Sequence, residues 1–149
     1  MLKRHPHKRT STRSLRVILR AFGVVDMLAF IAVAMPIAWI ETGHRWAGLG
    51  EFPAVAVAAY LARSASLMYG LHGMLLFLLA TDTVRYGKLI RWIGGMTVFH
   101  GGFMLTIDLV EQMPLWWILV EGPAFSLTGV VILVAQRFTN GVEAIDASV

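Results

Sequence analysis

The sequence contains no cysteine, few charged residues and no acidic residue before Asp26. The lack of cysteine excludes disulfides, thiolate nucleophiles and cysteine-ligated metal ions. Only 15% of the 149 residues are charged, whereas 57% are hydrophobic and the mean hydropathy is +0.68. This composition excludes a soluble or disordered chain and indicates residence in a membrane. The length allows one domain.

Basic residues are concentrated at the start of the chain, where seven of the thirteen lysines and arginines precede residue 21. A basic segment could contact nucleic acid, but beside an apolar span it more often sets orientation and meets anionic lipid headgroups. We therefore expect residues 1–20 to form a cytoplasmic tail that lies at anionic headgroups and does not bind nucleic acid. Its backbone is expected to be frayed as far as Leu15.

Four long apolar runs predict an all-α integral membrane protein. Each run is near the ~20 residues that a helix needs to cross the hydrocarbon core. The predicted spans, which make up a transmembrane domain over residues 21–136, cover residues 21–40, 54–80, 91–111 and 115–136. The expected connections between them are residues 41–53, 82–91 and 112–114, and residues 137–149 form a second tail.

The first run also resembles a signal peptide. Ala32-Val-Ala34 has the small-x-small pattern of a cleavage site that follows a basic segment. Against cleavage, the apolar run continues past this site to Ile40, and Asp26 interrupts any short hydrophobic region. We favour an uncleaved first span.

The two sides of the predicted spans differ in lysine and arginine content. The N-terminal tail and the 82–91 connection hold ten of these residues (seven plus three), whereas the 41–53 connection holds only Arg45. Because basic loops stay in the cytoplasm, both termini are expected there. The short connections make sequential helices antiparallel, which predicts an up-down-up-down four-helix bundle.

Small residues recur at helical spacing in the second and third spans. Ala62, Ser66 and Gly70 are four residues apart, and the third span contains Gly94-Gly95 and Gly101-Gly102. Helices in lipid associate through close backbone approach, which small residues permit. We therefore expect the second span to pack tightly against the third. Such faces also favour a homo-oligomer or a larger membrane complex.

Arg63 lies inside the second apolar run, where a charged side chain costs at least ~2.5 kcal/mol unless it has a partner or water. With each span centred on the bilayer at ~1.5 Å per residue, Arg63 and Glu121 fall at one depth. Asp108 lies nearer the outer interface, but side chains lean towards the N-terminal ends of their helices, which brings the three towards one level. The predicted buried polar cluster contains Arg63, Asp108, Glu121 and, at the interface, Glu41.

A second polar layer is predicted nearer the cytoplasm from Asp26 and His72, which fall at similar depth, with His100 between the two layers. His72 follows Arg63 by nine residues, about 180° around one helix. Both side chains therefore cannot point towards the bundle axis. Either one of the two pairs forms at a flank, or His72 faces an oligomer partner.

Motifs for catalysis or cofactor binding are missing. A bis-histidine haem needs two imidazoles at one level, but His72 and His100 are offset by about 8–10 Å in depth. No metal-ligand spacing, no G-x-S-x-G and no phosphate-binding loop occurs. We therefore assign no catalytic residue, no metal ligand and no cofactor.

Several stretches of the chain resemble small, uncharacterised four-span membrane proteins of bacteria. These stretches are RWAGLGEFP (45–53), AYLARSASLMYGLHGMLLF (59–77), DTVRY (82–86) and MPLWWILVEGP (113–123). The resemblance covers roughly residues 20–136. It implies a four-helix inner-membrane fold and implies no activity.

The leading hypothesis is a non-enzymatic membrane scaffold or accessory subunit, in which the buried charges fix the register of the helices. The alternative is a small transporter or a proton- or cation-binding membrane protein that uses the same acidic cluster. One guanidinium cannot compensate several carboxylates, so an excess acid would bind a proton or a cation. A membrane enzyme on a lipid-like substrate is a third possibility, which no motif supports.

Overall fold

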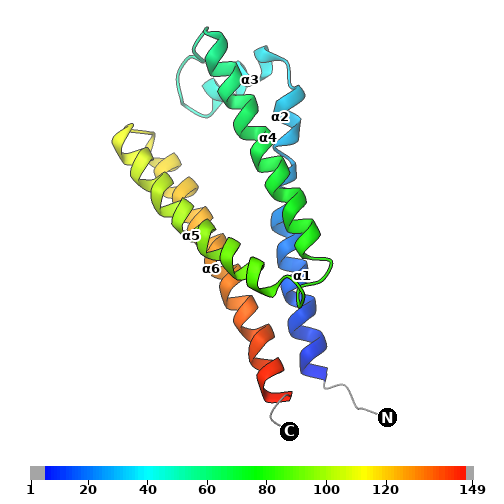
Figure 1. Cartoon of the computed structure of the whole chain (residues 1–149). Coiled ribbons are helices and arrows are strands. Elements are labelled where there is room, and N and C mark those ends of the chain that lie inside the picture. Colours follow the sequence, from blue (N-terminus) through cyan, green and yellow to red (C-terminus); the bar gives the residue numbers. More distant parts are fainter. Residues whose placement is uncertain (1–5, 147–149) are drawn as a thin grey trace. The chain divides into compact units, whose positions relative to one another are not determined.

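The structure, a computed structural model, describes the backbone of residues 6–146 and the side chains of residues 12–139. Within these limits the fold is entirely helical, as predicted (Figure 1). The helices are α1 (Pro6–Met27), α2 (Phe30–Ala34), α3 (Ile37–Trp46), α4 (Ala56–Leu79), α5 (Gly87–Val110) and α6 (Leu115–Asp146). The all-α prediction is therefore confirmed.

Four stretches of helix in the described part of the chain are long and apolar enough to cross a membrane. They are Thr12–Ala34, Ala56–Leu79, Gly87–Val110 and Leu115–Thr139. Many of their large apolar side chains point outwards; Trp92 and Leu119, for example, are each 64% exposed. Exposed apolar surface on this scale is unfavourable in water and is what lipid contact requires. The chain is a multi-pass membrane protein.

The chain divides into two compact units. The first unit comprises Met1–Ala21 and Phe77–Val149, and the second comprises Phe22–Leu76. The first unit thus contains the start of α1, together with α5 and α6. The second contains the end of α1, the short helices α2 and α3, and nearly all of α4.

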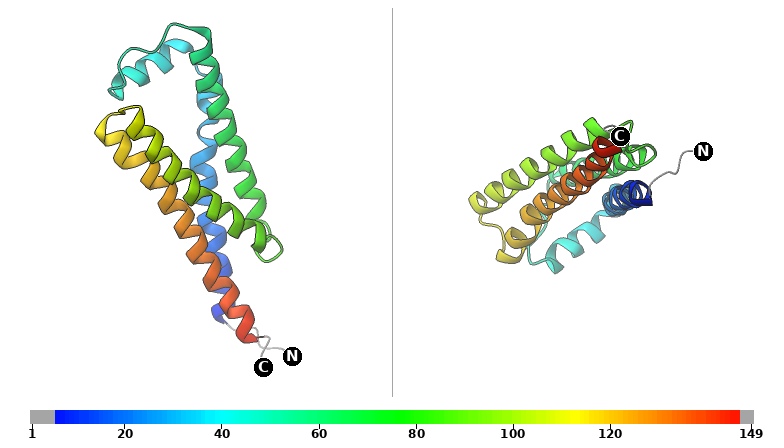
Figure 2. Two further views of the ribbon diagram at one scale, coloured as in Figure 1. Left: turned by 60° about the vertical axis from the view of Figure 1, so that its left-hand side comes forward. Right: turned by 90° about the horizontal axis from the view of Figure 1, so that it is seen from below.

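Helices α5 and α6 of the first unit lie side by side along their length (Figure 2). Glycines form the close contacts between them. A Cβ atom added at Gly129 would lie 2.6 Å from the Gly94 carbonyl oxygen, and one at Gly122 would lie 2.8 Å from the Gly101 carbonyl oxygen. Residue numbers rise along α5 as they fall along α6, so the two helices are antiparallel. Such separations are possible only without side chains, which explains the glycines at these positions.

Helices of the second unit also pack closely through glycines. A Cβ atom at Gly73 of α4 would lie 2.5 Å from the Gly23 carbonyl oxygen of α1, and one at Gly70 would lie 2.5 Å from the Phe30 ring of α2. The first apolar segment and α4 are therefore also antiparallel neighbours. Our expectation that the small residues of the second and third spans pack against each other is wrong for Gly70, Gly94 and Gly101. Each of these glycines instead faces the other neighbour of its span within one unit.

The first apolar segment begins earlier and ends sooner than the predicted span of residues 21–40. Helix α1 starts at Pro6, since proline fits the first turn of a helix, where its missing N–H is not needed. Leu15 and Leu19 are fully buried, and this packing stabilises helix where we expected a frayed tail.

A break at Met35-Pro36 ends the first segment. Pro36 has no N–H and its ring collides with the carbonyl four residues earlier, so α2 ends at Ala34. Met35 is extended, with ψ 136°, as expected for a residue before proline. The chain then forms α3, which occupies residues that we expected to belong to the span and to the 41–53 loop.

The last two helices are joined by a tight turn, as predicted for residues 112–114. Helix α5 ends at Val110, and Gln112 adopts φ 54° in the left-handed region. Its neighbour Met113 donates a backbone hydrogen bond to the Asp108 carbonyl oxygen at 3.0 Å. Helix α6 then continues beyond the predicted end at residue 136, with Gln136 and Thr139 both buried.

Candidate functional site

Two carboxyl groups of the first unit meet where α5 and α6 join. Asp108 lies in the last turn of α5, and Glu121 lies in the second turn of α6. The connection between the helices brings these two turns together. The Gly101–Gly122 contact, two turns before Asp108 on α5 and next to Glu121 on α6, holds the backbones close. We call Asp108 and Glu121 the carboxyl pair.

Asp108 is only 2% exposed, although it is an acid in an apolar helix. Its carboxyl group lies close enough to that of Glu121 for the two to interact through hydrogen bonding and electrostatic repulsion. Its Oδ2 atom is buried and has no hydrogen-bond partner among the described residues. Burying a carboxyl oxygen without a partner is costly, so this position is one that packing alone does not explain.

Glu121 has one further partner on its own helix. The Trp117 indole Nε1 donates a hydrogen bond to Glu121 Oε2, one turn away at a spacing of four residues. The indole N–H can only donate, so this hydrogen bond fixes the position of the Glu121 carboxyl group. The Trp117 ring also packs edge-on against Trp116 at 5.2 Å between ring centres.

His100 lies two turns before Asp108 on the same helix, within electrostatic range of Glu121. Its ring packs edge-on against Phe125 of α6, with ring centres 4.8 Å apart. His100 is exposed at the helix surface. A titratable imidazole thus stands beside the carboxyl pair on the same pair of helices.

The second unit contains a separate polar pair. His72 Nδ1 of α4 and Asp26 Oδ2 of α1 are 2.8 Å apart, and their side chains are 36% and 19% exposed. The depth argument from sequence placed these two residues at one level, and the structure brings them together. His100, which we placed between the layers, belongs to the other unit. A layer that contains all three residues stays a prediction.

Arg63 also finds a partner in the second unit. Its Nη2 atom donates to the Met35 carbonyl oxygen at 3.0 Å, at the break between α2 and α3. Glu41, the interfacial acid of the predicted cluster, lies on α3 in the same unit and is partly exposed. An ionic link from Arg63 to Asp108 or Glu121 would join the two units, and it stays a prediction.

Because Arg63 and His72 are about 180° apart around α4, we expected that the two side chains could not both point towards the bundle axis. Both nevertheless contact the segment between residues 26 and 35. His72 meets it where α1 is still helical. Arg63 reaches the stretch beyond the helix break with its longer side chain, so no oligomer partner is needed to accommodate His72.

Sequence reasoning missed two partners of the site residues. The Met35 carbonyl was overlooked because a backbone acceptor leaves no residue-specific pattern; the following proline was the available clue. Trp117 lies near the start of the fourth predicted span, where tryptophan commonly lies at the membrane interface, and its hydrogen bond was not predicted. Its spacing of four residues from Glu121 was the sign that it could also donate a hydrogen bond.

Comparison of the chain with protein-family models, with curated proteins and with solved structures gives no match. The site must therefore be interpreted from its own chemistry. Two adjacent carboxyl groups repel when both are charged, so such a pair either shares a proton or holds a cation. The described residues include no group of three or more His, Asp or Glu side chains able to hold a metal ion.

Proposed function

We propose that this protein is a small proton transporter in which the carboxyl pair Asp108–Glu121 binds the proton. The observation that supports this proposal most strongly is the Asp108 carboxyl group. It is almost fully buried against a second carboxyl group, and one of its oxygen atoms has no hydrogen-bond partner in the described part of the chain. Ionisable residues placed in this way within membrane helices mark proton or ion pathways.

A proton suits the pair better than a metal ion. Two carboxyl groups can hydrogen-bond to each other only when one of them carries a proton. Zinc sites use three or four protein ligands and Ca²⁺ takes six to eight oxygen ligands, whereas the pair supplies two side chains. His100, which is within electrostatic range of Glu121, is a titratable group that could exchange a proton with the pair.

The first test is infrared spectroscopy of the reconstituted full-length protein. A protonated carboxylic acid has a carbonyl band that a carboxylate lacks, and we expect this band to change with pH in the wild type. It should be lost in Asp108→Asn and Glu121→Gln and kept in Glu51→Gln, which changes an exposed acid outside the spans. A wild-type spectrum without the band would contradict proton binding at the pair.

The second test measures transport. Liposomes that contain the protein and a pH-sensitive dye should acidify when a potential is applied across the membrane. We expect Asp108→Asn to lower the flux by about a hundredfold, the lower end of what a positioned proton-transfer group contributes. Glu51→Gln should transport as the wild type does. Flux equal to that of protein-free liposomes, or flux unaffected by Asp108→Asn, would overturn the proposal.

A scaffold or accessory subunit remains the second candidate function. The Asp26–His72 pair and the Arg63–Met35 contact each connect α4 to an earlier segment of the chain. Polar contacts of this kind stabilise helix packing in membrane proteins. In this alternative the polar contacts only hold helices in register. It predicts normal folding and no proton flux for the wild type and for every carboxyl variant.

For either function we propose the bacterial inner membrane, with both termini in the cytoplasm. The distribution of lysine and arginine supports this orientation. The basic N-terminal residues would then lie beside anionic headgroups of the cytoplasmic leaflet.

A further inference from the structure

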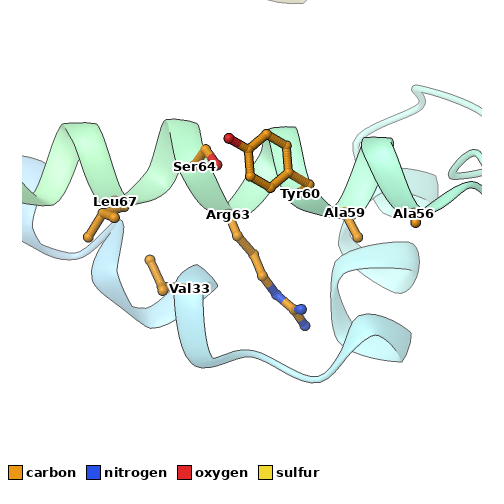
Figure 3. Close-up of a pocket in the computed structure, with 7 residues that line it drawn as sticks. All are labelled: Val33, Ala56, Ala59, Tyr60, Arg63, Ser64 and Leu67. Carbon is orange, nitrogen blue, oxygen red and sulfur yellow. The ribbon is translucent and has the colours of Figure 1, made fainter.

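A cavity of about 480 Å³ opens beside Arg63 in the second unit. Its lining comes from α2 and from the first half of α4 (Figure 3). The residues that line it are Val33, Ala56, Ala59, Tyr60, Arg63, Ser64 and Leu67. The walls are thus mostly apolar, and one guanidinium enters from one side. Cavities of this size accommodate a large part of an organic ligand.

The helix break positions the guanidinium. Carbonyl groups at the end of a broken helix lack their intrahelical partners, and Arg63 Nη2 donates to the Met35 carbonyl oxygen at 3.0 Å. This bond holds Nη2, and no hydrogen bond joins the other terminal nitrogen, Nη1, to a described residue. Nη1 therefore remains as a donor for a ligand that carries a carboxylate or phosphate.

The charge of Arg63 has no ionic partner within its own unit. In the part of the chain that the structure describes, Glu41, the acid nearest to the break in sequence, forms no ion pair with Arg63, and Asp26 pairs with His72 instead. A guanidinium in an apolar cavity is unfavourable unless an anion accompanies it. The complementary occupant is therefore an anion, and the apolar lining calls for an anion that carries a hydrocarbon chain.

The depth of Arg63 matches a lipid headgroup. Arg63 follows Ala56, the first residue of α4, by seven positions, which is about 10 Å along the helix axis. Figure 3 shows its side chain leaning towards the Ala56 end of α4, away from the middle of the helix. This direction brings the guanidinium near the polar boundary of the bilayer, as expected for a long basic side chain. Leu67 and Val33 lie on the other side, at the level of acyl chains.

We propose that the Arg63 cavity binds an anionic phospholipid. The phosphate group would accept hydrogen bonds from the Arg63 guanidinium, and an acyl chain would lie against Ala59, Leu67 and Val33. This site differs from the basic N-terminal tail, because it selects a single lipid molecule between helices. It also does not depend on the carboxyl pair, which belongs to the first unit.

The test is lipid retention by the full-length protein in detergent, measured by native mass spectrometry. The probes are phosphatidylglycerol, phosphatidylcholine with the same acyl chains, and glycerol phosphate, which has the charged group without chains. We expect phosphatidylglycerol to bind more tightly than phosphatidylcholine and glycerol phosphate not to compete. Arg63→Gln should weaken the binding of phosphatidylglycerol about tenfold, as expected from the loss of one charge-assisted hydrogen bond.

Two further variants keep the result interpretable. Ala59→Leu narrows the cavity and leaves Arg63 in place, so it should also weaken the binding of phosphatidylglycerol. If Arg63→Gln fails to fold, the result for Ala59→Leu tests the proposal by itself. Arg91→Gln removes an exposed charge elsewhere and should bind as the wild type does. Equal retention of the two phospholipids, or retention unchanged in Arg63→Gln and in Ala59→Leu, would overturn the proposal. Full competition by glycerol phosphate would overturn it too, because the site would then take a small anion.

Discussion

At the scale of single residues, the polar groups inside this membrane protein differ in how they are satisfied. Arg63 uses a backbone carbonyl freed by proline, His72 uses a carboxylate, and Glu121 uses an indole N–H. Asp108 Oδ2 and Arg63 Nε are both buried and have no hydrogen-bond partner among the described residues. Asp108 differs from Arg63 in that its carboxyl group is almost fully buried and lies beside a second carboxyl group.

The Asp26–His72 contact is expected to be structural and modest in strength. Polar contacts between membrane helices average well under 2 kcal/mol, and both side chains here are partly exposed. We expect a double-mutant cycle with Asp26→Ala and His72→Ala to give a coupling free energy of about 0.5–1.5 kcal/mol. The measurement is unfolding in mixed detergent micelles. Strictly additive single and double variants would show that the contact contributes nothing.

At the scale of helices, the glycines of α5 have two different roles. Gly94 and Gly101 face α6 at backbone distance, whereas a Cβ atom at Gly95 or Gly102 would meet nothing within 4 Å. The adjacent glycines in Gly94-Gly95 and Gly101-Gly102 therefore look alike in the sequence but not in the structure. Only one member of each couple is needed for packing.

This difference gives a matched pair of variants on one hairpin. Gly122→Ala would bring a methyl group 2.7 Å from the Leu105 Cβ atom and 2.8 Å from the Gly101 carbonyl oxygen. We expect it to destabilise α5–α6 packing by about 1–3 kcal/mol, the usual effect of overpacking. Gly102→Ala should be neutral or slightly stabilising, since alanine favours helix over glycine.

The readout for both variants is the unfolding midpoint in detergent. If Gly122→Ala unfolds at the same denaturant concentration as Gly102→Ala, the close approach of α5 and α6 is not a determinant of stability.

Sequence reasoning predicted most of this level of structure. Hydrophobic runs located the four apolar helices, and the depth argument paired Asp26 with His72. It failed to predict which neighbouring helix a given helix face packs against. Gly70 meets α2 and Gly73 meets α1, rather than the next helix along the chain. Small residues indicate that a helix face packs closely, but they do not identify the helix that it packs against. The sequence also contains Pro36, but we placed it inside the first predicted span because the residues around it are apolar. We therefore did not predict the helix break that this proline causes.

At the scale of the whole molecule, the pattern of basic residues is the only guide to orientation, and the cysteine-free chain makes it easy to test. Single cysteines replace exposed residues in three connections, as Glu51→Cys, Thr81→Cys and Glu111→Cys. We expect a membrane-impermeant maleimide to label positions 51 and 111 in intact cells, and position 81 only after lysis. Labelling of position 81 alone in intact cells would show the inverted orientation.

The tight α5–α6 turn has a consequence for biosynthesis. Only four residues separate the last residue of α5 from the first of α6, and the two helices meet through their backbones. The second helix therefore finds its partner as soon as it emerges from the ribosome, and both can leave the translocon as one hairpin. Asp108 would then be shielded by α6 before its carboxyl group had to face the acyl chains alone.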